Sequence, residues 1–179
     1  MILNFPSQTL SLQTAQIETP LGTMFAIANQ AGLYLLEFAD RPQLEAEIRL
    51  LQKKTGSQIV PGDNQMLEKL REELSAYFQG KRMQFSIPLL PGGTAFQHAV
   101  WKILSSIPAG ETRSYLQIAQ MLNKPTASRA VGNANGKNPI AIVVPCHRVI
   151  GADGSLCGYA GGIGRKHWLL DHEKQFAQK

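Results

Sequence analysis

The spacing of apolar residues divides the first half of the chain into strands and helices. Residues 23–28 and 32–38 are rich in apolar side chains and flank a turn-forming segment, which predicts two paired strands. Residues 45–55 and 65–78 repeat apolar side chains every three or four positions, as amphipathic helices do. Residues 85–89 alternate apolar and polar side chains and are expected to form another strand. This half offers packing but little chemistry.

The second half begins with a run of helices. Residues 95–105 form the first, and Ser114 is expected to cap a short helix over 115–122. Thr126 is expected to cap another, which runs to about residue 133 and is rich in small side chains. Two short helices joined by a tight turn suggest a helix-turn-helix, in which small residues allow close approach to a surface. The alternative is ordinary tight packing between helices.

An apolar run over 140–144 precedes the most informative motif of the chain. The run is expected to be a buried strand that ends at Pro145, because proline cannot donate to a sheet. Cys146 then lies at the edge of the core, beside His147 and Arg148. A thiol in basic surroundings loses its proton more easily, and the thiolate is the reactive species. The pattern therefore favours a nucleophile over a packing residue.

The segments after the motif supply further side chains near the thiol. An Asp-Gly pair at 153–154 predicts a hairpin, which returns the chain so that the glycine-rich loop 158–162 lies near the thiol. Tyr159 gives this loop a flat aromatic face for a pocket wall. The alternative is a half-buried aromatic residue of an ordinary loop. A last helix is expected over 165–176, with Glu173 near its end.

The order of Cys146 and His147 limits how they can cooperate. Adjacent side chains point apart on a strand and lie about 100° apart on a helix, so a bridging water is a better link than a direct bond. A carboxylate behind the imidazole would orient it and support its positive charge. Glu173 is the expected carboxylate; the alternative is a surface glutamate.

Composition limits the classes of protein that remain. The chain has 179 residues and 44% hydrophobic content, without an apolar stretch near the roughly 20 residues that span a bilayer. Residues 1–16 lack the pattern of a secretory signal. The two cysteines and four histidines show no zinc-ligand spacing. We therefore expect a cytoplasmic, reducing setting, no cofactor, no structural metal and no membrane association.

Charge is concentrated in one half of the chain. Residues 1–90 hold eight Lys/Arg and nine Asp/Glu, a net of −1, whereas residues 91–179 hold ten and four, a net of +6. The basic half also carries the candidate thiol, which suggests a polyanion as partner; a solvated basic face is the alternative. Pro91-Gly92-Gly93 is the best boundary between two domains, 1–90 and 91–179.

Several motifs together resemble the O6-alkylguanine-DNA alkyltransferases, also called methylated-DNA–protein-cysteine methyltransferases. The resemblance is very specific over residues 92–175 and looser before them. It implies an α/β (α+β) fold with an N-terminal ribonuclease-H-like sheet domain and a C-terminal winged helix-turn-helix domain. The segments that carry it are Thr19-Pro20-Leu21-Gly22, Arg129-Ala130-Val131-Gly132, Asn138-Pro139, Pro145-Cys146-His147-Arg148-Val149, Gly158-Tyr159-Ala160-Gly161-Gly162 and Trp168-Leu169-Leu170-Asp171-His172-Glu173.

The resemblance implies single-turnover DNA repair, in which Cys146 accepts the alkyl group of O6-alkylguanine in double-stranded DNA. His147 would act as base through a water, Glu173 would orient His147, and Asn138 would support the turn that holds the cysteine. Activity on O4-alkylthymine stays open, and a monomer is expected.

The resemblance also implies contacts with DNA and with the flipped base. Tyr115 would help to rotate the nucleotide, Arg129 would fill the gap in the duplex, and Tyr159 would form a pocket wall. Val149 would contact the guanine through its carbonyl. Ala160 stands where some relatives carry serine, which removes a hydroxyl donor to the alkylated oxygen. The other DNA-facing residues implied are Ser114, Ala127, Ala130 and Gly132.

Other classes remain open from the residues alone. A cysteine hydrolase would also use a cysteine, a histidine and a carboxylate, but it would turn over repeatedly. A plain DNA-binding module with a structural cysteine is the simplest alternative. Within the family, Cys146 argues against the alkyltransferase-like proteins that lack the acceptor, and the chain lacks the cysteines of members with an added zinc domain.

Overall fold

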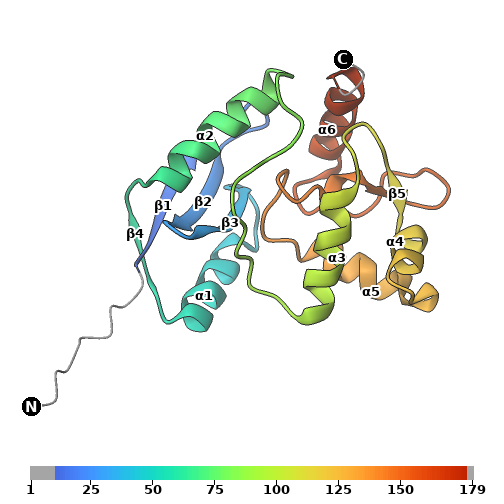
Figure 1. The fold of residues 1–179 in the computed structure, drawn as a ribbon, viewed down its shortest axis with the longest axis horizontal. Helices are drawn as coiled ribbons and strands as arrows, with labels where there is room; N and C mark the ends of the chain where they lie inside the picture. The colour runs from blue at the N-terminus through green and yellow to red at the C-terminus, as the bar shows by residue number, and fades with distance from the viewer. Residues whose placement is uncertain (1–10, 177–179) are drawn as a thin grey trace, which may run out of the picture.

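The structure is a computed structural model that describes residues 11–176. Figure 1 shows a sheet with helices against it, beside a second group of helices formed by the later part of the chain. The long segment between α2 (Gln65–Phe78) and α3 (Ala95–Ser106) connects the two groups.

The sheet has four strands in the order β3-β2-β1-β4. They are β1 (Ser11–Ile17), β2 (Met24–Asn29), β3 (Gly32–Phe38) and β4 (Gln58–Pro61). The first three form an antiparallel meander, and β4 pairs with β1 in parallel. The predicted pair of strands over 23–28 and 32–38 is therefore confirmed.

Two helices of the first half pack against the sheet, and both were predicted. Helix α1 (Leu44–Thr55) buries Leu44 and Leu51 against Leu12, Ile27 and Leu35. Helix α2 (Gln65–Phe78) buries its apolar stripe in the larger core, which continues into the second half of the chain. This shared core places the C-terminal end of α2 next to the last helix.

The free edge of β3 is closed by two short contacts rather than by strands. Leu33 forms a single bridge with Leu89, and Leu36 forms one with Ile140. The strand predicted over 85–89 is thus wrong: Pro88 accepts one hydrogen bond from Leu33 but has no amide hydrogen with which to continue a ladder. The covered edge still protects β3 from pairing with another chain.

The helices of the second half are α3 (Ala95–Ser106), α4 (Tyr115–Met121), α5 (Ser128–Gly136) and α6 (Ile163–Phe176). Helices α4 and α5, joined through the short 3-10 turn η1 (Pro125–Ala127), form the predicted helix-turn-helix. The 165–176 prediction is confirmed, because α6 starts two residues earlier and ends at the same position.

One predicted helix cap is present and the other is not. The Ser114 hydroxyl accepts a hydrogen bond from the Gln117 amide at 3.2 Å, and the Gln117 side chain reciprocates. Thr126, in contrast, lies inside η1, and α5 begins at Ser128 without a side-chain cap. Pro125 fixes the chain in the 3-10 turn, and this turn delays the start of the helix.

The predicted hairpin at 153–154 is only a tight turn. Gly154 adopts φ +82°, and the Gly151 amide donates to the Ser155 carbonyl at 2.9 Å. No strand follows it among the described residues. The strand before it, β6 (Val149–Ile150), pairs instead in parallel with β5 (Arg113–Ser114).

Candidate functional site

The chain before the cysteine is a buried turn held by Asn138. The Asn138 Nδ2 atom donates to the carbonyls of Ile140 at 3.2 Å and Val144 at 2.8 Å, while its Oδ1 accepts from the Ile140 amide at 3.0 Å. Ile142 adopts φ +69°, which no strand residue does. The predicted strand is therefore wrong: the apolar run is buried because it folds back into the core, and not because it belongs to a sheet.

Cys146 lies at the end of this turn, in the 3-10 segment η2 (Cys146–Arg148), and is 5% exposed. Asn138 Nδ2 lies 3.1 Å from its Sγ. Burial raises the pKa of Cys146 to about 11, although the bond from Asn138 acts in the opposite direction. The expectation of an acidic thiol is therefore wrong for this state: burial outweighs the basic residues nearby in the sequence, and the Arg148 guanidinium binds Glu173.

His147 and Glu173 form a fully buried pair. Nε2 of His147 lies 2.9 Å from Oε1 of Glu173, and both residues are 0% exposed. Burial lowers the pKa of His147 below its usual value, although the contact with Glu173 opposes this shift. A neutral imidazole next to a carboxylate carries its proton on Nε2. Its other nitrogen, Nδ1, is buried and has no hydrogen-bond partner within residues 11–176, and it is the basic atom.

Glu173 is held by donors from two distant parts of the chain. Arg148 donates from Nε to Oε2 at 2.7 Å and from Nη2 to Oε1 at 2.8 Å, and the Tyr77 hydroxyl donates to Oε1 at 2.8 Å. Burial alone would raise the pKa of this carboxyl group, but the bonds from His147 and Arg148 and their charges lower it well below its usual range. Glu173 is therefore ionised at neutral pH.

The glycine-rich loop lies over the motif, as predicted. The Tyr159 ring is 8% exposed and meets the His147 ring edge-to-face, with centroids 6.4 Å apart. Ala160, its neighbour, is exposed. The two rings therefore pack together beside the cysteine motif.

Arg165 ties this loop to the first half of the chain. Its guanidinium donates to the Gly161 carbonyl at 3.1 Å, to the Leu21 carbonyl at 2.9 Å, and to both carboxylate oxygens of Asp40 at 2.9 and 2.8 Å. It also lies 4.0 Å from the centroid of the Phe38 ring. One side chain thus fixes the position of the loop relative to the sheet.

Lys166 holds the opposite side of the loop. Its Nζ donates to the carbonyls of Val149 and Cys157, and its side chain is buried. The Tyr115 hydroxyl lies 3.4 Å from the same Cys157 carbonyl, and burial raises the pKa of Tyr115 to about 12. The tyrosine hydroxyl therefore stays protonated and can donate.

The helix-turn-helix presents the remaining predicted residues. Arg129 and Ala130 on α5 are exposed, and Arg129 has no hydrogen bond or ion pair to any described residue. Gly132 faces the Tyr115 ring, since a side-chain carbon at this glycine would lie 3.7 Å from it. Ser114 and Ala127 are partly exposed beside them. A surface of small side chains with one free arginine suits close approach to a nucleic acid.

Sequence reasoning missed three side chains that build this site: Tyr77, Arg165 and Lys166. Tyr77 lies on the apolar stripe of α2, where a tyrosine looks like core packing. The two basic residues resemble solvent-facing positions of an ordinary helix. Only their contacts in the fold distinguish them.

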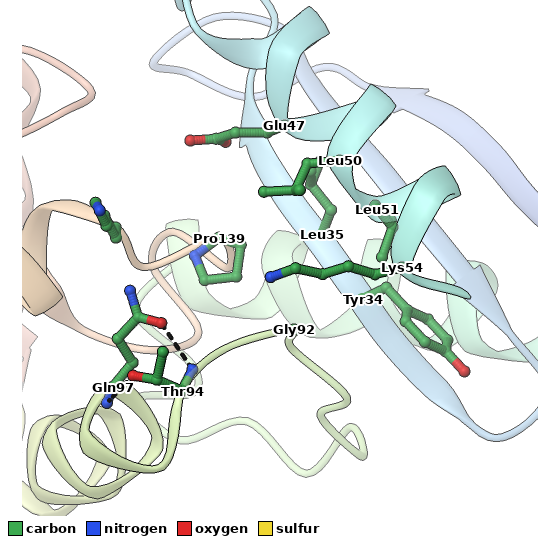
Figure 2. A pocket seen from close by; sticks show the side chains of 11 residues that line it. Tyr34, Leu35, Glu47, Leu50, Leu51, Lys54, Gly92, Thr94, Gln97 and Pro139 are labelled. Carbon is green, nitrogen blue, oxygen red and sulfur yellow. Dashed lines mark hydrogen bonds between the residues drawn. The ribbon is translucent and has the colours of Figure 1, made fainter. Parts of the chain in front are cut away.

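A separate cavity of about 380 Å³ lies between α1 and the start of α3 (Figure 2). Leu50 and Lys54 line it from α1, and Thr94 and Gln97 line it from the start of α3. None of the predicted site residues lines this cavity, so it is distinct from the cysteine site.

The described residues contain neither a metal-binding cluster nor a membrane-spanning helix. Within residues 11–176, no three side chains of the His, Cys, Asp and Glu types are arranged to hold a metal ion. The same residues contain no helix with the length and apolar character needed to cross a membrane.

Comparison with known proteins identifies the two halves of the chain. Residues 13–91 match the family model described as "6-O-methylguanine DNA methyltransferase, ribonuclease-like domain", and residues 95–175 match the one described as its "DNA binding domain". These matches and the solved structures below confirm the predicted fold class.

Relatives of known name match along most of their length. The methylated-DNA–protein-cysteine methyltransferase of Methanosarcina barkeri is 43% identical over 159 residues, which are 88% of this chain and 94% of the relative. The Shigella flexneri protein of the same name is 44% identical over 171 residues, 92% of this chain and 96% of the relative.

Solved structures give the same result. The O6-methylguanine methyltransferase of Mycobacterium tuberculosis is 42% identical, with a TM-score of 0.78 over 92% of this chain and 94% of that chain. A complex of the M. tuberculosis protein with DNA has a TM-score of 0.76, at 42% identity over 93% and 94% of the two chains. This chain therefore belongs to the 6-O-methylguanine DNA methyltransferase family, and it is a DNA-repair enzyme that transfers an alkyl group from DNA to a cysteine of its own.

Proposed function

We propose that Cys146 accepts the alkyl group, and that the group comes from O6 of a guanine in double-stranded DNA. The 2.9 Å contact between His147 Nε2 and Glu173 Oε1 carries this proposal. It leaves Nδ1 as a buried base on the residue that follows the thiol. The proposal thus places a nucleophile, a base and an orienting carboxylate in one buried site.

The thiol needs this base. With a pKa of about 11, Cys146 is protonated at neutral pH and is a weak nucleophile. A water between Sγ and Nδ1 would pass the thiol proton to His147, whose resulting positive charge Glu173 would stabilise. Asn138 would steady the sulfur throughout, since its amide donates to both Sγ and the Val144 carbonyl.

The transfer then proceeds in one displacement. Sulfur attacks the alkyl carbon, a carbon–sulfur bond forms, and the bond between that carbon and O6 breaks. The electron pair of the broken bond stays with the guanine, which takes up a proton. This uptake balances the proton that the thiol has lost. The product is a thioether that water does not hydrolyse at useful rates, and each molecule acts once.

The duplex must present its damaged base to this buried sulfur. A base inside the stack is out of reach, so the nucleotide must rotate outward. Arg129 is the side chain proposed to enter the duplex and offset the lost stacking, and its exposed, unpaired state supports the role. Tyr115 would assist the rotation, and α5 would approach the DNA through Ala127, Ala130 and Gly132, with Ser114 beside them.

The flipped guanine is proposed to lie against Tyr159. The carbonyl of Val149 would contact its edge, together with the backbone of Cys146. Ala160 brings only its backbone amide to the alkylated oxygen. A monomer, a cytoplasmic setting and the absence of a cofactor remain predictions from the sequence, and activity on O4-alkylthymine stays open.

Transfer of a label tests the assignment. Duplex DNA with a radiolabelled methyl group on O6 of guanine is incubated with the protein, and peptide mapping locates the label. We expect at most one label per molecule, on Cys146, with complete loss in Cys146→Ala and normal transfer in the matched Cys157→Ala control. Repeated turnover would indicate a hydrolase instead, and binding without transfer would indicate a DNA-binding module.

A further inference from the structure

Tyr77 brings the ribonuclease-like half of the chain into the cysteine site. It lies one residue before the end of α2, is 0% exposed, and donates its hydroxyl to Oε1 of Glu173 at 2.8 Å. The two residues are 96 positions apart in the sequence. The contact is therefore a product of the packing of α2 against α6.

Contacts of the Tyr77 backbone and of its ring fix the position of this hydroxyl. The Tyr77 carbonyl accepts a hydrogen bond from Nε2 of His172 at 2.7 Å. Its ring packs against Phe85 and His172, with centroid distances of 5.5 and 5.2 Å. His172 and Glu173 are consecutive on α6, so the backbone and the hydroxyl of Tyr77 hold the same turn of that helix.

Tyr77 and His147 share one oxygen of the carboxylate. Oε1 of Glu173 accepts from Tyr77, from His147 and from Nη2 of Arg148, whereas Oε2 accepts from Nε of Arg148 and more distantly from the Gly110 amide. Each donor to Oε1 withdraws negative charge from it. A donor other than His147 therefore weakens the pull of the carboxylate on the imidazole proton.

We propose that Tyr77 is a positioning residue for the alkyl transfer, acting through Glu173 to keep His147 neutral. This inference rests on the proposed function, in which Nδ1 of His147 receives the thiol proton. A neutral imidazole has that nitrogen free, whereas an imidazolium has it occupied. The hydroxyl of Tyr77 thus helps to keep the base available as the pH falls.

Opposing effects set the charge state of His147. Burial disfavours the imidazolium, and so do the positive charges of Arg148 on η2 and Lys166 on α6, while the Glu173 charge favours it. Loss of the Tyr77 hydroxyl concentrates charge on Oε1 and strengthens this last effect. The pKa of His147 should then rise. As the solution is acidified, the transfer rate should therefore begin to fall at a higher pH than in the wild type.

The experiment compares Tyr77→Phe with Tyr34→Phe. Tyr34 is a partly buried tyrosine of β3 whose hydroxyl bonds with Asn29, so the control removes the same group away from the site. Single-turnover rates of methyl transfer from duplex DNA are measured from pH 5.5 to 8.5. Because the lost hydrogen bond is to a charged carboxylate, and only part of its effect reaches His147, the acid limb of Tyr77→Phe should move up by about 0.5–1 pH unit.

Further measurements decide between the outcomes. NMR titration of the histidine rings should show the same upward shift for His147, with DNA affinity unchanged. Superimposed pH profiles for the wild type and Tyr77→Phe, or equal shifts in both variants, would overturn the proposal. If Tyr77→Phe does not fold, 3-fluorotyrosine at position 77 replaces it. Its more acidic hydroxyl should move the acid limb of the pH profile to lower pH. An acid limb that does not move counts against the proposed role of Tyr77. A wild type that places no label on Cys146 would overturn the proposed function itself.

Discussion

The side-chain amide of Asn138 lies 3.1 Å from Sγ of Cys146 and 2.8 Å from the carbonyl of Val144. One side chain therefore supports both the sulfur and the buried turn before it. The turn contains Ile142 at φ +69°, a conformation that a β-branched residue adopts only when its surroundings impose it.

Asn138→Ala should cost both stability and reactivity. The change leaves the Ile140 and Val144 carbonyls without their buried donor, which destabilises the fold by about 2–4 kcal/mol. Chemical denaturation measures this loss, and methyl transfer measured well below the unfolding midpoint should be slower as well. A variant of wild-type stability and rate would contradict the assigned support.

The two cysteines should differ in their reaction with iodoacetamide. Cys157 is exposed, whereas Cys146 is 5% exposed with a pKa raised to about 11. At pH 7.5 mass spectrometry should therefore find Cys157 modified first. Modification of Cys146 should accelerate about tenfold per pH unit as the pH rises toward its pKa, because the thiolate is the reactive form. Fast modification of Cys146 at pH 7 would show that its thiol is already ionised.

Glu173→Gln should be destabilising at neutral pH and less so in acid. The variant leaves the Arg148 guanidinium buried beside a neutral amide, which costs about 3–5 kcal/mol. The pKa of Glu173 is lowered in the fold, so its contribution is present above the unfolded value of about 4.3 and is lost as the pH falls below it. Denaturation at pH 7 and at pH 3 should show the difference from wild type shrinking; a constant difference would argue against an ionised carboxylate.

Arg129→Ala should separate action on DNA from reaction at the sulfur. Arg129 is exposed on α5 and has no hydrogen bond or ion pair to the described residues of the cysteine site, so repair of duplex DNA should slow much more than reaction with free O6-benzylguanine. Arg49→Ala is the charge-matched control, because Arg49 lies on α1 with a side chain 72% exposed. Equal losses on both substrates would remove the proposed role of Arg129 in the duplex.

Asp40→Asn should loosen the loop that carries Tyr159. Asp40 pairs with Arg165, which also holds the Gly161 carbonyl. The pair is partly exposed, so its loss should cost only about 0.5–1 kcal/mol and depend on salt. Amide hydrogen exchange over 158–162 should nevertheless become faster. Asp171→Asn is the control, because it removes an exposed carboxylate of α6 that pairs with His167 and not with Arg165. It should leave that exchange unchanged.

The amino-acid sequence determined most of the local structure and the motif chemistry. Periodicity located α2 at its observed limits, and the Ser114 signal located the start of α4. The residues Cys146, His147 and Glu173, together with the basic second half, were enough to indicate a nucleophile with a polyanion partner. These features are local, and neighbouring residues encode them directly.

Only the tertiary structure decided how the apolar run over 140–144 folds and which state the thiol adopts. An apolar run records burial but not direction, so a turn clamped by Asn138 and a strand look alike in sequence. Desolvation raises the pKa of Cys146, and desolvation follows from packing, which also directs Arg148 to Glu173. The contact of Tyr77 with Glu173 joins residues 96 positions apart, and such a contact arises only when two helices distant in sequence share one core.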